Sequence, residues 1–334
     1  MLSRFQLSLI LCLFTGTLSA NTDLPQPDIQ RAQKIHQLLQ QYHYHPAELN
    51  HSAYQSIKQQ IELLDASTPD PAEFAKAFNT LWQDGPFSHV RLAKRQQSVE
   101  EIAAYLDTMN VGEQGATLTW QGRIAVLTVT TMMGLDTIEQ INSAYQQLTN
   151  AKALVIDLRL NEGGAFAVRP LVAHLLNHPL TAGAFASRLW FNAHHRRPIS
   201  SDWQALPPWH GWSIRSFWQD VQAQPLTKIE FSPEAPYYAG PVYLLVSGKT
   251  ASAAELAATA LATLPNVTLV GENTAGEMLS QTLFDLNDDS QLFLPIADYF
   301  SSNFGRIEGR GIEPDIKINA DQAMQHALTL AAQH

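Results

Sequence analysis

The sequence predicts an α/β fold with a small helical module near its N-terminal end, and two observations support this. Apolar residues recur at three-to-four spacing from residue 28 to about residue 81, which is the period of amphipathic helices. Beyond Gly115, short β-branched runs alternate with helical stretches, as in a largely parallel sheet covered by helices. The 334 residues suit one large domain or two of ordinary size.

The N-terminal module is expected to hold three short helices with polar outer faces. Prolines punctuate the helical pattern and separate the three runs; they are Pro46, Pro69, Pro71 and Pro86. Residues 85–94 are interpreted as an irregular connection, and residues 99–108 as one more helix.

The predicted sheet takes its strands from short apolar runs, at 124–129, 153–158, 242–246, 267–270, 292–296 and 316–318. Helices are expected between them, at 138–148, 171–176 and 252–264. An insertion at about 180–240 holds five of the seven tryptophans and has no clean period. Long irregular insertions in compact domains are often lids or binding surfaces.

Composition excludes several function classes. The chain is 45% hydrophobic and 16% charged, which excludes disorder of the whole chain. Lys and Arg number 21 against 31 Asp and Glu, and this net charge of −10 argues against nucleic acid as a partner. After the first 20 residues no apolar run approaches the roughly 20 residues of a spanning helix, which excludes a polytopic membrane protein.

Residues 1–20 have the order of a secretory signal peptide. Arg4 precedes the apolar run 7–14, and small residues follow up to Ala20, where cleavage is expected. A buried helix or an uncleaved anchor is the alternative. The only cysteine, Cys12, lies in this segment, so the mature chain has no thiol. We therefore expect an exported protein, periplasmic or extracellular, with no membrane anchor after cleavage.

Several segments resemble nucleotide-binding or metal-binding motifs but lack a residue that the motif requires. Residues 247–250 imitate the end of a phosphate-binding loop, but Tyr243 stands where that loop needs a glycine. His194, His195 and His210 have no carboxylate or histidine at ligand spacing. The sequence also lacks a dinucleotide fingerprint and the common metallopeptidase motif. Neither a cofactor nor a metal ion is expected.

The most informative segment surrounds Ser252. A strand is expected to end near Gly248, and a helix of small residues is expected to begin at about Ser252. The N-terminus of a helix favours developing negative charge, and the Ala253 N–H could supply one oxyanion donor there. The alternative is structural, because Ser252-x-x-Glu255 is also a capping box in which the serine only satisfies the helix end.

Four motifs, occurring in order along the chain, favour the interpretation of Ser252 as a nucleophile over that of a helix cap. They are residues 154–164, 248–255, 269–276 and 307–315. Together they resemble the S41 serine peptidases, a group that includes the tail-specific (C-terminal processing) peptidases, the tricorn core and the interphotoreceptor retinoid-binding modules. The resemblance covers roughly residues 80 to 320. It implies a ClpP/crotonase-like catalytic core in the α/β class.

The resemblance also implies roles for individual residues. Ser252 matches the family's nucleophile, and the Gly164 N–H matches the second oxyanion donor beside that of Ala253. The tail-specific branch uses a lysine as base, but Glu277 occupies its place here. A carboxylate cannot replace that amine directly, and Lys249 is only a weaker substitute.

The branch that resembles the tricorn core uses a histidine preceded by a serine, together with a glutamate near the C-terminus. Here Ser88-His89 and Glu308 stand at those places. Histidine suits the task because its ordinary pKa lies near neutrality. Glu308 would orient His89 directly or through Ser88. Other carboxylates close in sequence stay as alternatives, namely Glu272, Glu277 and Glu313.

The function that the sequence indicates is an exported serine peptidase acting on peptides or proteins through an acyl-enzyme on Ser252. The alternative is a non-catalytic binding module on the same fold, for an apolar ligand or a peptide, with the Trp-rich insertion as the pocket. We expect a helical module at 21–95 and a catalytic domain at 96–334. About thirty residues separate Leu92 from Gln121, too few for the PDZ domain of about 90 residues that tail-specific peptidases usually carry.

Overall fold

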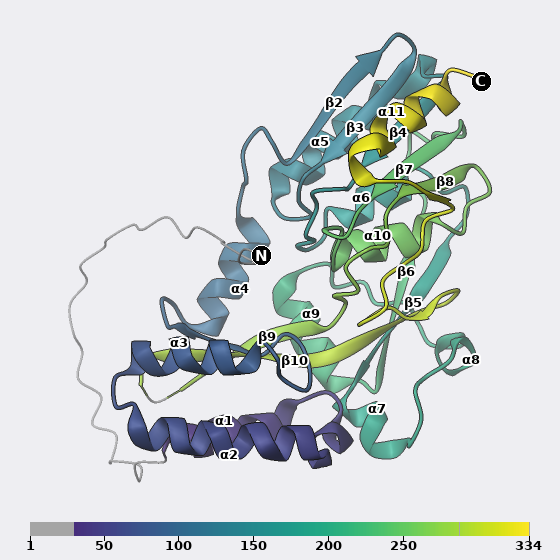
Figure 1. Cartoon of the computed structure of the whole chain (residues 1–334). Helices are drawn as coiled ribbons and strands as arrows, with labels where there is room; N and C mark the ends of the chain where they lie inside the picture. Colours follow the sequence, from purple (N-terminus) through teal and green to yellow (C-terminus); the bar gives the residue numbers. More distant parts are fainter. Residues whose placement is uncertain (1–29, 287, 334) are drawn as a thin grey trace.

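The computed structural model describes residues 30–286 and 288–333, so the predicted signal peptide at 1–20 lies outside the described residues. Two six-stranded sheets and the helices around them make up this part of the chain. Figure 1 shows the first helices at one end of the molecule and the C-terminal helix α11 at the other. No helix among these residues is long and apolar enough to cross a bilayer.

The three expected N-terminal helices are confirmed as α1 (Arg31–Tyr42), α2 (Ser52–Ser67) and α3 (Pro71–Trp82), with a 3₁₀ turn, η1 (Pro46–Asn50), between the first two. Each helix buries one apolar face; Ile35, Ile61 and Phe78 have no exposed surface. Asp70 caps α3 by accepting the Glu73 N–H at 2.8 Å.

The first sheet has the strand order β12-β8-β7-β4-β3-β2. Its strands are β2 (Ala116–Gln121), β3 (Ile124–Val129), β4 (Ala153–Asp157), β7 (Val242–Val246), β8 (Val267–Gly271) and β12 (Ile316–Lys317). All neighbours are parallel except β2, which forms an antiparallel hairpin with β3. The prediction of a partly parallel sheet is confirmed, and the carboxyl ends of β4, β7 and β8 lie side by side.

Helices cover both faces of this sheet. On one face, α11 (Ala320–Ala331) packs its three buried alanines against β4 and β7. The other face is covered by α10 (Ala253–Leu261), α6 (Val168–Ala173) and α5 (Leu135–Gln146), which is followed by the 3₁₀ turn η2 (Leu148–Asn150). The small side chains of α10 explain the close packing, because all of its residues after the first are buried.

The Trp-rich insertion is regular, contrary to the expectation of an irregular segment. It forms β5 (Leu180–Ser187), α7 (Arg188–Ala193), α8 (Ser200–Trp203), α9 (Ile214–Ala223) and β6 (Leu226–Phe231). These strands join a second sheet of order β1-β10-β5-β6, with β10 (Ser290–Ser301) also pairing with β9 (Ser280–Asp285) and β11 (Gly305–Arg306). Both faces of β5 are largely covered, so alternation of polar and apolar residues gave no signal.

Part of the connection read as irregular is strand β1 (Arg91–Lys94), which pairs antiparallel with β10. Asn79 of α3 holds β1 from its other side, donating to the Leu92 carbonyl and accepting the Leu92 N–H, both at 2.8 Å. An edge strand is thereby satisfied by a side chain. After β1 comes α4 (Val99–Thr108), as expected, with a capping box between Ser98 and Glu101.

Candidate active site

Ser252 lies in the turn between β7 and α10, at the carboxyl edge of the first sheet. Its φ of +54° is in the left-handed region, which a residue with a side chain rarely adopts. Its side chain makes no capping hydrogen bond to α10. Only the backbone half of the expected capping box serves the helix end, because the Ser252 N–H donates to Glu255 Oε2 at 3.2 Å. The hydroxyl is therefore left for another task.

Asn161 ties the turn that follows β4 to the Ser252 turn. Its side-chain amide donates to the Val129 carbonyl at 3.0 Å, and its side-chain oxygen accepts the Gly163 N–H at 2.9 Å. Its carbonyl accepts the Ala251 N–H at 3.1 Å. Asn161 is fully buried, and sequence reasoning missed its role. The only signal was an asparagine two residues before the Gly-Gly turn.

The first glycine of this turn, Gly163, lies against Ser252, and the second, Gly164, lies against Met132 and Met133. A Cβ on Gly163 would fall 2.6 Å from the Ser252 Cβ, so only glycine fits there. Gly163 and Gly164 have φ values of +94° and +137°. The amides of Gly164 and Ala253 donate no hydrogen bond within the described residues. Two free donors, one next to Ser252 in the chain and one next to Gly163, which packs against Ser252, are compatible with the oxyanion hole expected from the sequence.

Glu255 is the carboxylate that links α10 to the segment after β8. It is fully buried and accepts the Thr274 hydroxyl at 2.5 Å and the N–H groups of Gly276 and Glu277, each at 2.8 Å. Burial raises the pKa of Glu255, and these hydrogen bonds, with that from Ser252, oppose the rise. The sequence pattern indicated only a helix cap at Glu255, and these further contacts were not predicted.

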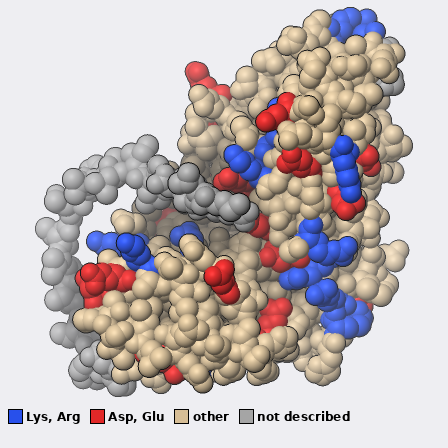
Figure 2. Space-filling model, viewed as in Figure 1, with Lys and Arg blue, Asp and Glu red and all other residues tan. Residues whose placement is uncertain are grey.

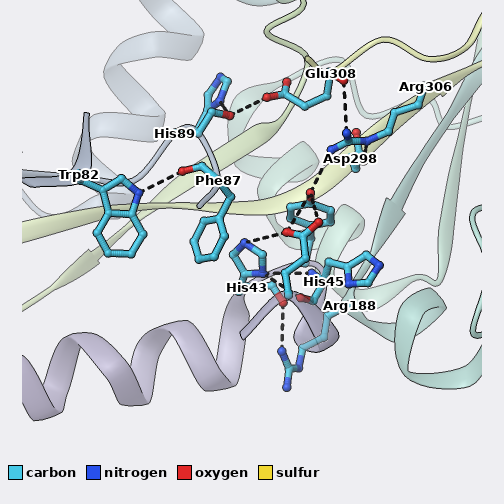
Figure 3. A network of polar contacts seen from close by, with 12 residues as sticks. His43, His45, Trp82, Phe87, His89, Arg188, Asp298, Arg306 and Glu308 are labelled. Atoms are coloured by element: carbon cyan, nitrogen blue, oxygen red, sulfur yellow. Dashed lines mark hydrogen bonds and ion pairs between the residues drawn. The ribbon is translucent and has the colours of Figure 1, made fainter. Parts of the chain in front are cut away.

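The structure brings Ser88, His89 and Glu308 together, and within the described residues no hydrogen bond joins these three to Ser252. The Ser88 hydroxyl donates to Glu308 Oε1 at 2.6 Å and lies 2.7 Å from His89 Nδ1. Figure 3 shows Glu308 and His89 approaching one another from different parts of the fold. Because the serine proton is directed to Glu308, Nδ1–H of His89 donates to Ser88 Oγ, which leaves Nε2 free to accept a proton.

The Glu308 carboxylate also accepts the N–H groups of Met278 at 2.7 Å and of Leu279 at 3.2 Å. Of the alternative carboxylates, Glu272 accepts the Ala320 N–H and Glu313 pairs with Lys317, both at the exposed surface. Among the acids proposed from the sequence, Glu308 is thus the one whose carboxylate contacts Ser88.

His89 combines an unusual backbone with a shifted pKa. Its φ is +63°, so the chain turns sharply between Ser88 and β1. Burial lowers the pKa of His89, while the nearby carboxylates of Glu308 and Glu277 oppose that shift. The Glu277 carboxylate, expected from the sequence at the place of the lysine in the other branch, is thus near enough to raise the pKa of His89. Lys249, the weaker substitute, is exposed.

The Trp-rich insertion contributes aromatic packing near the Gly163-Gly164 turn. Phe166, two residues after Gly164, has its ring centroid 5.8 Å from that of Trp209 and 5.9 Å from that of Trp212. Trp203 of the same insertion is buried. In the described part of the chain, no three of the His, Cys, Asp and Glu side chains are grouped to hold a metal ion. Figure 2 shows basic and acidic side chains interspersed over the face in view.

Comparison with known proteins agrees with this arrangement. Residues 123–318 match the family model described as peptidase family S41. A carboxyl-terminal-processing protease from Synechocystis sp. is 26% identical over 262 residues, which cover 78% of this chain and 47% of that protein. The chain spans less than two thirds of the length of the curated relatives it matches.

Solved structures share the fold. A lipoprotein from Streptococcus agalactiae aligns with a TM-score of 0.62 at 18% identity, over 94% of this chain and 99% of that one. The photosystem II D1 C-terminal processing protease aligns with a TM-score of 0.52 at 14% identity, over 87% of this chain and 92% of that one. The α/β core predicted from the sequence is therefore confirmed.

We predict that Gly163→Ala destabilises the protein because its methyl group collides with the Ser252 Cβ. Gly112→Ala is the matched control, since Gly112 has a similar φ of +91° but nothing within 4 Å of an added Cβ. Both variants carry the cost of a left-handed alanine, and Gly163→Ala adds an overpacking cost of about 1–3 kcal/mol. Urea denaturation measures the difference. Equal losses in the two variants would show that the close approach to Ser252 is not real.

Proposed function

Because the chain belongs to peptidase family S41, we propose that it is an exported serine peptidase that hydrolyses peptide bonds through an acyl-enzyme on Ser252. The observation that carries the proposal is the pairing of two half-sites. A strained serine with two free amides beside it stands at the sheet edge, and a Glu308–Ser88–His89 relay stands on the neighbouring segment. A binding module needs neither.

In the proposed acylation, Ser252 Oγ attacks the scissile carbonyl carbon and its proton passes to His89 Nε2. The carbonyl oxygen becomes negatively charged and takes hydrogen bonds from the Gly164 and Ala253 N–H groups. The protonated His89 then gives its proton to the leaving nitrogen as the C–N bond breaks. The acyl group remains on Ser252, and the new amine leaves.

Deacylation follows the same path with water as the nucleophile. His89 Nε2 takes a proton from water, whose oxygen attacks the ester carbon, and the proton returns to Ser252 Oγ as the ester bond breaks. Throughout, Ser88 accepts the Nδ1–H of His89 and donates to Glu308, so the carboxylate stabilises the imidazolium through a hydroxyl. The lysine dyad is not proposed, since Glu277 stands at the lysine's place.

The proposal includes export and the domain boundaries. Cleavage after Ala20 gives a mature chain beginning at Asn21, which N-terminal sequencing of the exported protein reads directly. The helical module is assigned to 21–95 and the catalytic core to 96–334. Between β1 and β2 the chain forms only α4, so we propose that substrate is selected on the core rather than by a PDZ domain inserted there.

We predict that Ser252→Ala lowers kcat by about 10⁴-fold or more, since the nucleophile is removed while the fold is kept. Turnover of a quenched-fluorescent peptide library measures the loss, and Ser201→Ala, an exposed serine on α8, is the control. A fluorophosphonate should label the wild type at Ser252 and leave Ser252→Ala unlabelled. Undiminished turnover, or labelling at another residue, would contradict the proposal. A tight apolar ligand on an unreactive Ser252 would favour the binding module instead.

The pH dependence of kcat/KM should report His89. The histidine accepts a proton only when neutral, so activity falls as pH drops through its pKa. Burial lowers that pKa from its ordinary 6.5, which places the midpoint of the acid limb below pH 6.5.

Glu277→Gln removes a charge that raises the pKa of His89, so it should move the acid limb to still lower pH. Glu139→Gln, at an exposed position on α5, should leave it in place. A midpoint above pH 6.5, or an upward shift in Glu277→Gln, would be inconsistent with His89 as the base.

A further inference from the structure

An ion pair holds the Glu308 loop from the side opposite Ser88. Arg306 on β11 donates through Nε to Asp298 Oδ2 on β10, at 2.6 Å, and the Asp298 side chain is 2% exposed. The same guanidinium donates through Nη1 to the backbone carbonyl of Glu308 at 3.3 Å. Figure 3 shows Arg306 and Asp298 next to Glu308. One planar side chain therefore fixes both a strand and the backbone of the proposed catalytic acid.

The third contact of Arg306 leads to the N-terminal helical module. Its Nη2 donates to the Tyr44 hydroxyl at 3.2 Å. Tyr44 is 1% exposed and lies between α1 and η1, where its N–H donates to the Pro295 carbonyl of β10 at 3.2 Å. The module thus contacts Arg306 through the buried Tyr44 hydroxyl.

His43, the residue before Tyr44, contacts the segment that carries Ser88 and His89. The His43 ring lies 4.2 Å, centroid to centroid, from the ring of Phe87, the residue that precedes Ser88. Phe87 is held in turn by the Trp82 indole, which donates to its carbonyl at 3.0 Å. Neighbouring residues of one short segment therefore touch both Arg306 and Phe87. Figure 3 shows His43, Phe87 and Trp82 on one side of this arrangement and Arg306 on the other.

We propose, on the basis of the proposed function, that Arg306 is a positioning residue and that Tyr44 couples it to the N-terminal module. Arg306 sets the place of Glu308 relative to Ser88 and His89, and it acts through Glu308 rather than on the reacting atoms. The N-terminal module then helps to position the group formed by Glu308, Ser88 and the proposed base His89. Neither the motif nor the resemblance assigns Arg306, Tyr44 or Asp298 a role.

The chemistry of the ion pair explains why an arginine stands here. Asp298 Oδ1 has no hydrogen-bond partner within the described residues, so Arg306 is the cation that compensates this buried carboxylate. Lysine would keep the charge but could not hold Asp298, Tyr44 and the Glu308 carbonyl at once, because its ammonium is a point donor on a flexible stem. Arg306→Lys therefore separates the charge from the geometry.

The test compares Arg306→Lys and Tyr44→Phe with wild type in kcat, KM and the pH profile of kcat/KM. We expect Arg306→Lys to lower kcat by about 10- to 100-fold with KM changed less than about twofold, because Glu308 is displaced while the substrate surface is kept. The acid limb should move to lower pH, since a displaced Glu308 supports the protonated His89 less. Tyr44→Phe should change kcat and the acid limb in the same directions by a smaller amount.

The control is Arg196→Lys. Arg196 is exposed, lies far from Glu308 in the sequence, and donates two hydrogen bonds to the Asp202 carboxylate, at 2.6 and 2.7 Å. This variant should leave kcat and the acid limb unchanged. Loss of stability in Arg306→Lys with wild-type kcat and acid limb would overturn the inference, and so would a loss seen only in KM. These outcomes are distinct from failure of the proposed function, which Ser252→Ala decides: if that variant is inactive and Arg306→Lys is normal, only the positioning role fails.

Discussion

The site depends on four consecutive backbone amides that two buried carboxylates share. Glu255 takes the N–H groups of Gly276 and Glu277, and Glu308 takes those of Met278 and Leu279. A buried amide left unpaired costs about 1–3 kcal/mol, and a buried carboxylate without donors costs more. Each group therefore satisfies the other. As a consequence, Glu255 at the start of α10 and Glu308 are both fixed to the same short segment, residues 276–279, which sets their relative position.

The backbone is strained at both Ser252 and His89, and in both places the surrounding contacts maintain the strain. Ser252 and His89 both have positive φ, a conformation that persists only where the surroundings determine it several times over. At Ser252 the surroundings are the Asn161 turn, the close approach of Gly163 and the hydrogen bond that the Ser252 N–H donates to the Glu255 carboxylate. At His89 they are the anchored Phe87 on one side and β1, paired with β10, on the other. The chain places reactive side chains where local preference alone would not.

What the sequence predicted was local, and what it missed was long-range. The apolar runs at 124–129 and 242–246 predicted strands β3 and β7 because buried parallel strands need no partner-specific pattern. The second sheet was not predicted as a separate sheet: its strand at 292–296 (β10) was assigned to the first sheet, β1 has four residues, and β5 is built from small residues without alternation. Ser88, His89 and Glu308 came from the resemblance, and their contact spans 220 residues. The further contacts of Glu255 and Arg306 have no local signature, since their partners lie in distant segments or across a hairpin.

The proposed chemistry requires one contact above all, between the base His89 and the nucleophile Ser252. A crystal structure of the wild-type chain with a peptidyl phosphonate bonded to Ser252 measures it most directly. We predict that His89 Nε2 lies within about 3.2 Å of Ser252 Oγ. We also predict that the phosphonyl oxygen lies within about 3.1 Å of the amide nitrogens of both Gly164 and Ala253. A phosphonyl oxygen bound elsewhere, or a His89 that keeps its bond to Ser88 while Nε2 points away from Ser252, would contradict it.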